Sequence, residues 1–432
     1  MTFNKLTMKL LLSSILLLLI TVAFGQEIVQ WRGPSRDGIY PDKNLLKKWP
    51  EAGPAADLEI SGFGKGYSQP VVCKDIIYVT GRKKDSTDVI SAYDLSGKFL
   101  WDSNYGHAWI NSFPDTRCTP TIQNDKIYLI SGMGEVCCLN AKNGEKIWFQ
   151  DAQNQFKGEY GRWGISESVL LTDQAALYVT GGKETTVVAF DKITGKLLWK
   201  TKSVGGERAY VSSLLIERNG LKIILAETAN NLIGINSVDG EILWNFDLQP
   251  FEPGNMGKGI NPNTPIYQDG EIFVTSGYDH IAVMVSLSAD GKSVALKWKN
   301  EVMDTQIGGN VLVDGNIYGT NWISNNKGQW VCVNWTTGKT NWVKDWNNKG
   351  SIIAADGLLY CYEEKGGNIA LVQPDPSDFK IISTFKFEGG EGPFWAHPAI
   401  YDGKLYLRHG NVLHRYVVLT KSLGALKFEF LA

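Results

Sequence analysis

The sequence predicts an all-β protein built as one eight-bladed β-propeller. Three observations support this prediction: a strand–turn–strand unit that recurs eight times, a hairpin that follows it and ends on tryptophan, and a last unit that lacks its final strand. The units succeed one another about every 47 residues, a spacing typical of four-stranded propeller blades. The strand absent from the last unit indicates how the ring closes.

The first landmark is a short apolar strand, a polar turn and a second strand marked by an aromatic or apolar residue. β-Branched and aromatic residues favour strands, whereas Asp, Asn and Gly favour the tight turn between them. Two looser copies, at 168–178 and 213–224, have longer turns. The six regular copies span nine residues each and lie at 70–78, 120–128, 265–273, 310–318, 352–360 and 398–406.

The second landmark is clearest at 187–199, which reads Val-Val-Ala-Phe-Asp-Lys-Ile-Thr-Gly-Lys-Leu-Leu-Trp. A glycine precedes a tryptophan by four residues in five copies and by seven in a sixth, and the seventh unit, ending near Phe385, has lost both. A large ring on each outer strand can wedge against the neighbouring blade and bury much apolar area. We therefore expect a structural, blade-docking role for Trp101, Trp148, Trp199, Trp244, Trp298 and Trp342.

Ring closure is predicted from a missing strand. After residue 406 the chain has room for one more strand, at 412–418, but not for a tryptophan strand. We expect the missing outer strand at 57–60, ahead of the first unit, so that the N-terminal segment completes the eighth blade. The chain then divides into a signal peptide at 1–25, an N-terminal extension at 26–56, the propeller at 57–420 and a C-terminal tail at 421–432.

The first residues predict export. Lys5 and Lys9 flank an apolar run, Leu10–Val22, and small residues precede Gln26 at the positions that determine cleavage. We expect a periplasmic or secreted protein, with a retained membrane anchor as the alternative; no cysteine directly after the run offers a lipid attachment site. The net charge is only −2 and no basic run interleaves with aromatics, so we expect no nucleic-acid binding. No later segment approaches the length of a membrane span, so we expect none after cleavage. We also expect a monomer.

Polar residues precede the apolar inner strands, where a propeller presents one mouth of its central channel. The candidate ligand-binding residues at this mouth are Tyr67, Arg117, Trp163, Glu167, Arg208, Asn263, Trp395 and His397. Arg117, Arg208 and Lys349 are positioned to meet an anionic or hydroxyl-rich ligand; the alternative is that such residues merely hold water. Glu167 and His397 would form an acid–base pair only if they face each other, so catalytic residues stay unassigned. The histidines show no metal-ligand spacing.

The hairpin at 187–199 and its copies resemble the tryptophan-docking repeats of the PQQ-dependent alcohol dehydrogenases, the quinoprotein propellers. The resemblance covers essentially the whole mature chain. Five further stretches resemble a narrower group of exported PQQ-like propeller proteins of bacteria. They are Trp-Arg-Gly-Pro-Ser-Arg-Asp-Gly-Ile at 31–39, Gly-Tyr-Ser-Gln-Pro at 66–70, Trp-Gly-Ile-Ser-Glu-Ser at 163–168, Trp-Ala-His-Pro at 395–398 and Lys-Leu-Tyr-Leu-Arg at 404–408. The superfamily also contains non-enzymatic propellers such as the outer-membrane assembly factor BamB, so function stays open.

If this chain shared the site of the dehydrogenases, the resemblance would imply a quinone bound between a tryptophan floor and a ring formed by two adjacent, disulfide-bonded cysteines. A calcium ion held by carboxylate and amide oxygens polarises the quinone, and an Asp serves as base. Cys137 and Cys138 are adjacent, but their hairpin position sends successive side chains to opposite faces of a strand. Glu167 and Asn263 offer oxygens, whereas calcium takes six or more.

These demands favour a binding or scaffold protein without bound quinone, taking a small-molecule or protein ligand at the channel mouth. PQQ with calcium remains the cofactor of the alternative, a quinoprotein dehydrogenase that oxidises an alcohol or sugar. A further alternative is a BamB-like component of outer-membrane assembly.

Overall fold

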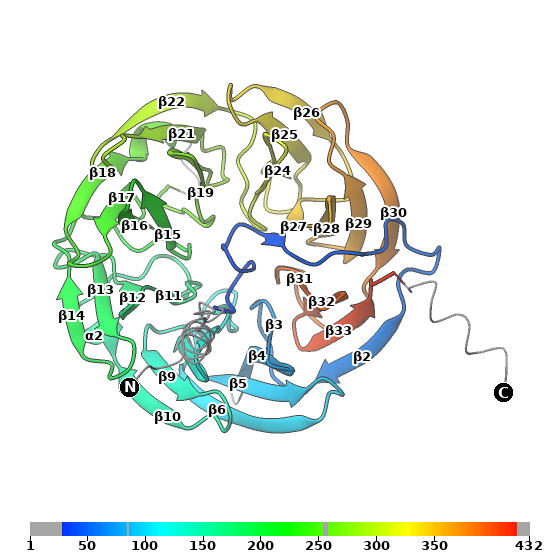
Figure 1. Ribbon diagram of the computed structural model, residues 1–432, viewed down its shortest axis with the longest axis horizontal. Coiled ribbons are helices and arrows are strands. Elements are labelled where there is room, and N and C mark those ends of the chain that lie inside the picture. The colour runs from blue at the N-terminus through cyan, green and yellow to red at the C-terminus, as the bar shows by residue number, and fades with distance from the viewer. Residues whose placement is uncertain (1–27, 84–85, 254–257, 421–432) are drawn as a thin grey trace, which may run out of the picture.

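The computed structural model describes residues 28–83, 86–253 and 258–420. Eight antiparallel sheets are arranged as blades around a central axis (Figure 1). This confirms the all-β, eight-bladed propeller. The signal peptide expected at 1–25 and the tail expected at 421–432 lie outside the described residues. Within the described part of the chain, no helix is long and apolar enough to cross a membrane.

Each blade is a meander whose successive strands are placed in order from the channel to the rim. Blade 1 consists of β3 (Val71–Cys73), β4 (Ile76–Lys83), β5 (Thr87–Asp94) and β6 (Phe99–His107), and blade 2 of β7 (Thr121–Gln123), β8 (Lys126–Ile130), β9 (Val136–Asn140) and β10 (Lys146–Gln150). Blade 3 consists of β11 (Leu170–Leu171), β12 (Ala175–Val179), β13 (Val187–Asp191) and β14 (Leu197–Lys200), and blade 4 of β15 (Leu214–Arg218), β16 (Leu221–Glu227), β17 (Asn231–Asn236) and β18 (Ile242–Asp247). Blades 5 and 6 are β19 (Ile266–Gln268), β20 (Glu271–Val274), β21 (Ala282–Leu287), β22 (Val294–Asn300); and β23 (Val311–Val313), β24 (Asn316–Thr320), β25 (Trp330–Asn334), β26 (Thr340–Lys344). Helix α2 (Ala152–Gln155) and the 3-10 turn η1 (Gln249–Phe251) lie in blade-to-blade connections.

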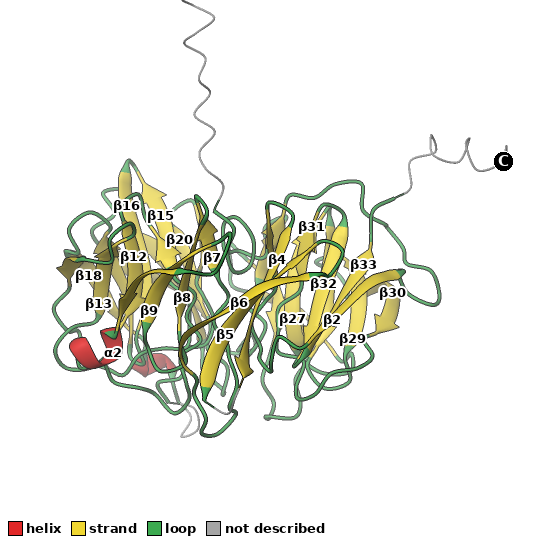
Figure 2. Ribbon diagram, turned by 90° about the horizontal axis from the view of Figure 1, so that it is seen from below, coloured by secondary structure: helices red, strands yellow, loops and turns green. Residues whose placement is uncertain are grey.

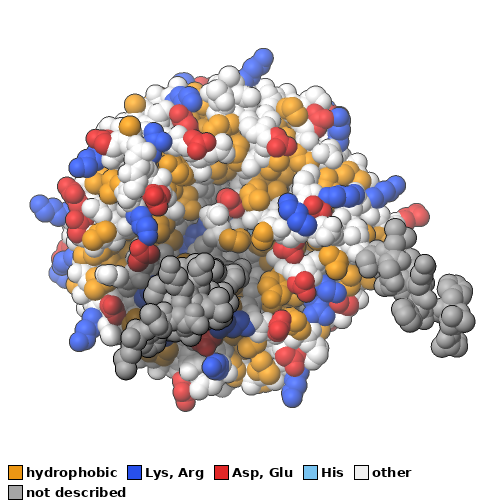
Figure 3. Space-filling view, in the orientation of Figure 1, with side chains coloured by type: hydrophobic (Ala, Val, Ile, Leu, Met, Phe, Trp, Pro, Cys, Tyr) orange, Lys and Arg blue, Asp and Glu red, His pale blue; other side chains and the backbone are white. Residues whose placement is uncertain are grey.

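The two faces of the ring differ because antiparallel strands alternate in direction. We call "turn face" the face that carries the turns between the first and second and between the third and fourth strands of a blade. The "connection face" carries the turns between the second and third strands and the long links from blade to blade. Figure 2 shows the blades from the side, with α2 at one end of the strands. Acidic and basic side chains are interspersed over the rim (Figure 3).

The tryptophan at the end of a hairpin joins one blade to the next. The indole nitrogen of Trp148 on β10 donates to the carbonyl of Lys192 at 3.1 Å, in the hairpin turn of the following blade. A Cβ added to Gly195 in that turn would lie 2.7 Å from the Trp148 ring. Trp298 and Trp342 donate in the same way to carbonyls of the blades that follow them, at 3.1 and 2.9 Å. Glycine is therefore required in the turn because the neighbouring ring packs directly on its backbone.

The seventh and eighth blades are completed by the N-terminal segment. Blade 7 consists of β27 (Gly350–Ala355), β28 (Leu358–Glu363), β29 (Asn368–Gln373) and β30 (Lys380–Lys386), with β1 (Ile39–Tyr40) added in parallel beside β27; blade 8 consists of β31 (Ala399–Tyr401), β32 (Lys404–His409) and β33 (Val412–Val417). Strand β2 (Ala56–Ser61) pairs with β33 as the outer strand of blade 8. The predicted closure of the ring by an N-terminal strand is confirmed.

At the seam of the ring, where the N-terminal segment joins blades 7, 8 and 1, other side chains take the place of the docking tryptophan. A Cβ added to Gly97 of blade 1 would lie 2.6 Å from a methyl group of Leu58, so Leu58 on β2 occupies the docking position. In blade 7 the ring of Phe385 meets Trp49 edge-to-face, with centroids 4.9 Å apart. The N-terminal extension thus supplies the contact that the seventh hairpin has lost.

Candidate functional site

The centre of the ring is filled by residues 31–40, which we call the channel plug. Figure 1 shows this segment, with β1, crossing the middle of the propeller. Arg32 is 2% exposed, and its guanidinium donates to the carbonyls of Gly308, Asn310 and Ile352 at 3.0, 2.5 and 3.0 Å. These carbonyls lie where the inner strands of blades 6 and 7 begin. One arginine therefore satisfies backbone groups at the channel ends of two blades.

Arg36 also donates hydrogen bonds to backbone carbonyls, on the other side of the channel. Its guanidinium donates to the carbonyls of Ser168 and Ser213 at 3.1 and 3.0 Å, in blades 3 and 4. Burial lowers the pKa of Arg32 and of Arg36 to about 10, so both stay charged at neutral pH. Both residues take left-handed backbone conformations, with φ of 58° and 59°. The plug is therefore bound to blades all around the ring.

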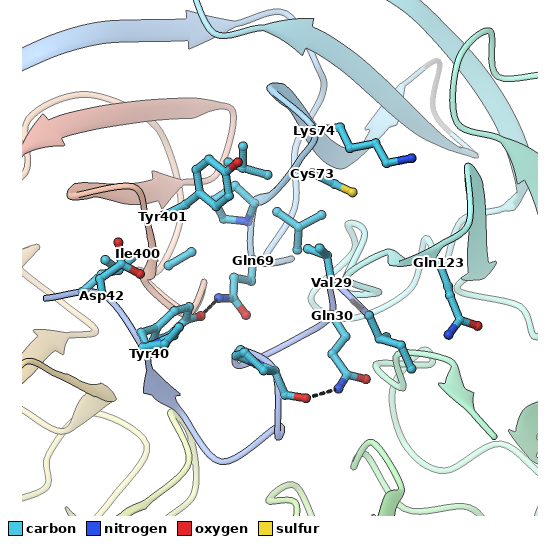
Figure 4. Close-up of a pocket in the computed structure, with 18 of the residues that line it drawn as sticks. Val29, Gln30, Tyr40, Asp42, Gln69, Cys73, Lys74, Gln123, Ile400 and Tyr401 are labelled. Atoms are coloured by element: carbon cyan, nitrogen blue, oxygen red, sulfur yellow. Dashed lines mark hydrogen bonds between the residues drawn. The ribbon is translucent and has the colours of Figure 1, made fainter. Parts of the chain in front are cut away.

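The plug separates two cavities. The cavity on the turn face has a volume of about 430 Å³ and is lined by Gln30, Gly33 and Tyr40 of the N-terminal segment. Figure 4 shows this turn-face cavity, with the hydrogen bond from Gln69 to the Tyr40 hydroxyl among its lining residues. The cavity on the connection face, which we call the mouth cavity, has a volume of about 550 Å³, and Trp31 of the plug lines it.

Five of the eight candidate residues line the mouth cavity. They are Tyr67, Arg117, Trp163, Trp395 and His397. The remaining three, Glu167, Arg208 and Asn263, are buried in the walls between blades. The five reach the cavity from the connections that lead into blades 1, 2, 3 and 8.

Two of the expected ligand-binding cations are neutralised inside the protein. Arg208 forms an ion pair with Glu167 at 2.7 Å, and both side chains are at most 2% exposed. Lys349 forms a similarly buried pair with Glu364 at 2.8 Å. Burial raises the pKa of Glu167 to about 7 despite the opposing effect of Arg208. Buried charges need partners, so Arg208 and Lys349 stabilise the walls between blades and are not free to bind a ligand in the cavity.

Asn263 and His397 also have internal partners. The Asn263 amide donates to the carbonyl of Thr305 and accepts from the backbone N–H of Gly309 at 3.2 Å. The Nδ1 atom of His397 lies 3.1 Å from Arg32. Because Glu167 faces Arg208 and His397 faces Arg32, the acid–base pairing of Glu167 with His397 does not form.

The contact with Arg32 determines the protonation of His397. A guanidinium can only donate, so Nδ1 accepts, the ring is neutral and Nε2 carries the proton. Burial, with the nearby Arg32 charge, lowers the pKa of His397 well below its usual range. His397 therefore offers the mouth cavity a neutral N–H donor.

Aromatic rings form two groups on the cavity wall. On one side Trp395 contacts Tyr67 and Phe113, with centroids 5.0 and 5.4 Å apart. On the other side Trp163 contacts Tyr210, with centroids 5.4 Å apart. We call these the Trp395 group and the Trp163 group. Trp31 lies on the plug, and its ring and that of His397 are arranged edge-to-face with centroids 5.2 Å apart.

Three cations on the cavity wall form no ion pair with any residue that the structure describes. Arg117 donates to backbone carbonyls of Asp115 and Phe113, Arg162 lies over the Trp163 ring at 5.8 Å, and Lys365 donates to Asn326 at 2.9 Å. Among the described lining residues the one carboxylate is Glu364, which Lys349 already neutralises. The mouth cavity is therefore positively charged.

The sequence did not identify Trp31, Arg162, Lys365 and Phe113 as lining residues. All four lie outside the repeated strands, in the N-terminal extension, in blade-to-blade connections or in a turn. Of these four residues only Trp31 lies in one of the five stretches of the narrower resemblance. Their members Arg32, Gln69, Ser168 and His397 contact the plug or belong to it.

The residues present do not fit the quinone and calcium arrangement of the dehydrogenases. Cys137 and Cys138 are free thiols on β9, opposite Leu129 and Tyr128, and neither lines the mouth cavity. The two expected oxygen donors, Glu167 and Asn263, are occupied by Arg208 and by backbone groups. Within the described ranges, no three His, Cys, Asp or Glu residues are placed to share a metal ion.

Fold and repeat define the class, an eight-bladed propeller of PQQ-like repeats. A family model described as outer membrane protein assembly factor BamB matches residues 86–323, and the chain belongs to that family. The uncharacterized protein RC0314 of Rickettsia conorii is 20% identical over 75% of this chain and 78% of its own length. BamB of Kangiella koreensis is 22% identical over 45% of each chain. The quinoprotein alcohol dehydrogenase PedH of Pseudomonas putida is 26% identical over 35% of this chain and 24% of its own length.

Solved structures share the fold at low identity. BamB from Moraxella catarrhalis superimposes with a TM-score of 0.58 at 14% identity, covering 84% of this chain and 97% of that chain. A europium-containing methanol dehydrogenase gives a TM-score of 0.65 at 14% identity, covering 87% and 88%. One architecture therefore serves an assembly factor and an enzyme, and the site must decide between them.

Proposed function

We propose that this protein is a binding propeller that takes a small ligand in the mouth cavity. The observation that carries the proposal is the cavity itself: about 550 Å³ lined by mostly half-buried aromatic rings and by polar groups that converge from several blades. Ligand sites of this size typically have mostly apolar walls and a few polar groups that fix the orientation of the ligand. Hydrogen bonds join neighbouring connections of the wall, as from the Trp163 N–H to the Tyr210 hydroxyl, and such bonds would limit the entropy lost on binding.

Four probes test the proposal: trigalacturonate, its neutral counterpart maltotriose, 2-naphthoate and its neutral counterpart 2-naphthol. Each is titrated into the protein while tryptophan fluorescence and heat are recorded. We expect at least one probe to bind, and the double substitution Trp163→Ala with Trp395→Ala to abolish its binding. Failure of all four to bind, or binding that survives the double substitution, would contradict the proposal.

A quinone-dependent dehydrogenase is the competing function. The occupied oxygen donors argue against it, as do the two free cysteines of β9, neither of which lines the mouth cavity. The protein is mixed with PQQ and calcium chloride, then desalted. Absorbance reports retained quinone, and dye-linked oxidation of ethanol and glucose reports turnover. We expect no turnover; stoichiometric uptake accompanied by turnover would establish the dehydrogenase instead.

Outer-membrane assembly is a second candidate, favoured by the family match and by apolar side chains on the outer strands. Phe99, Ile147 and Phe149 of blades 1 and 2 are 50, 45 and 40% exposed. This role requires export, which the apolar run at 10–22 supports. Cell fractionation tests export. Co-purification with an outer-membrane assembly complex that Phe149→Asp abolishes would support the assembly role, and its absence from such complexes would dismiss it.

A further inference from the structure

We infer that the ligand of the mouth cavity is an anion with a flat apolar face, either an acidic sugar or an aromatic carboxylate. The inference rests on the proposed function and deepens it by naming the ligand class. The flat face stacks on the aromatic groups, and the negative charge lies toward Arg117, Arg162 and Lys365. Charge, ring geometry and unused hydrogen-bonding groups each support this assignment.

The three cations reach the cavity from different parts of the ring. Arg117 lies in the connection from blade 1 to blade 2, Arg162 in the connection from blade 2 to blade 3, and Lys365 in the turn between β28 and β29 of blade 7. Their described hydrogen bonds and ring contacts are to carbonyls, an amide and an aromatic ring. The carboxylates of Asp88 and Asp115 act on Arg117 from nearby, but Asp115 is paired with Arg82. Burial lowers the pKa of Arg117, an energetic cost that a bound anion would offset.

The position of the cations relative to the rings favours a ligand that uses both. Arg117 lies over the Tyr67 ring at 5.8 Å, and Arg162 lies over the Trp163 ring at the same distance. Each aromatic group therefore has a guanidinium beside a ring. A guanidinium presents paired N–H donors that match a carboxylate or sulfate. A molecule stacked on either group would bring its acidic substituent within reach of an arginine.

Neutral hydrogen-bonding groups complete the site. The Nε2–H of His397 is a donor, and the Oε1 atom of Gln306 is a buried acceptor without a partner among the described residues. Its amide nitrogen donates to the Tyr278 hydroxyl at 2.8 Å, which fixes the side chain. The Oε1 atom has almost no accessible surface, so a ligand hydroxyl would reach it only if the Gln306 side chain turned toward the cavity. The Nε2–H of His397 can donate to a hydroxyl or to a carboxylate, so it suits both ligand sources.

The test compares the charged and neutral members of each probe pair at low and high salt. We expect trigalacturonate or 2-naphthoate to bind at least about tenfold more tightly than maltotriose or 2-naphthol, respectively. The double substitution Arg162→Gln with Lys365→Gln should weaken the anion at least about tenfold and leave the neutral probe unchanged. The matched control is Lys196→Gln with Lys339→Gln, which removes two exposed cations from the turn face.

Each outcome decides the inference. Preference for trigalacturonate identifies the acidic sugar, and preference for 2-naphthoate identifies the aromatic carboxylate. Equal binding of charged and neutral partners, or an anion affinity that the Arg162 and Lys365 substitutions do not change, would overturn the inference. If a neutral probe alone binds and depends on Trp163 and Trp395, the proposed function stands while the ligand class is wrong. Absence of all binding contradicts both.

Discussion

The repeated blades and the N-terminal segment are held by different chemistry. At Trp148 and Gly195 the contact between regular blades is one tryptophan ring, one indole hydrogen bond and a glycine turn. The segment from residue 31 to 61 occurs once, and it supplies two buried arginines, an edge strand and the cavity-lining Trp31. The comparison indicates that the repeat builds the ring, whereas the unrepeated segment closes it and shapes its ligand site.

Removal of the N-terminal segment should have the largest effect. Deleting residues 26–60 removes the plug and most of β2, leaving blade 8 with three strands and an empty channel. We expect the melting temperature to fall by more than about 10 °C, measured by calorimetry. The point substitution Ile60→Asp, which places a charge at a buried position of β2, should lower it in the same direction. An unchanged melting temperature in both variants would refute the closure by this segment.

Arg32→Ala should be the most costly single truncation in the plug. It leaves the carbonyls of Gly308, Asn310 and Ile352 without their shared donor. We expect a loss of roughly 3–5 kcal/mol in the free energy of unfolding, from denaturant titration. The control Arg162→Ala removes an exposed arginine and should change the free energy by less than about 0.5 kcal/mol. Equal effects of the two substitutions would show that the plug does not stabilise the ring.

The two kinds of docking contact can be compared directly. Trp148→Ala removes a large buried ring and its hydrogen bond, so we expect a loss of about 3 kcal/mol in the free energy of unfolding. Leu58→Ala removes a half-buried aliphatic side chain at the equivalent position of the seam, with an expected loss of about 1–2 kcal/mol. A larger loss from Leu58→Ala than from Trp148→Ala would reverse this ranking.

The smallest predicted effect concerns His107, at the end of β6 on the connection face. Its Nδ1 atom lies 2.6 Å from Glu135, and this hydrogen bond raises the pKa of His107. A raised pKa in the folded state stabilises the protein fully below about pH 6.5, and the stabilisation is lost as the pH rises through the folded pKa. The side chain is 76% exposed, so screening keeps the effect small.

The measurement for His107 is the free energy of unfolding of wild type and His107→Gln at pH 5.5 and pH 8.5. The difference between the two proteins should be larger at pH 5.5. The same difference at both values would show that the contact with Glu135 makes no pH-dependent contribution.

The ring could be predicted from the sequence because its determinants recur. Turn residues and the glycine-to-tryptophan spacing mark each blade, and a blade short of one strand indicated β2. The plug could not be predicted in this way, since Arg32 and Arg36 occur once and bond to carbonyls more than 80 residues away in sequence. The charge of the mouth cavity could not be predicted without knowledge of the fold either. Arg208, Lys349 and Arg162 look alike in the sequence, and only their neighbours show which of them is neutralised.

The most direct test of the contrast between ring and segment is the affinity of Trp31→Ala for whichever anionic probe the wild type binds. Trp31 belongs to the unrepeated segment and lines the mouth cavity, while its neighbour Arg32 continues to anchor the plug. Titration calorimetry should show an affinity at least about tenfold lower, with a melting temperature within about 2 °C of the wild type. An unchanged affinity would show that the N-terminal segment closes the ring without forming the ligand site.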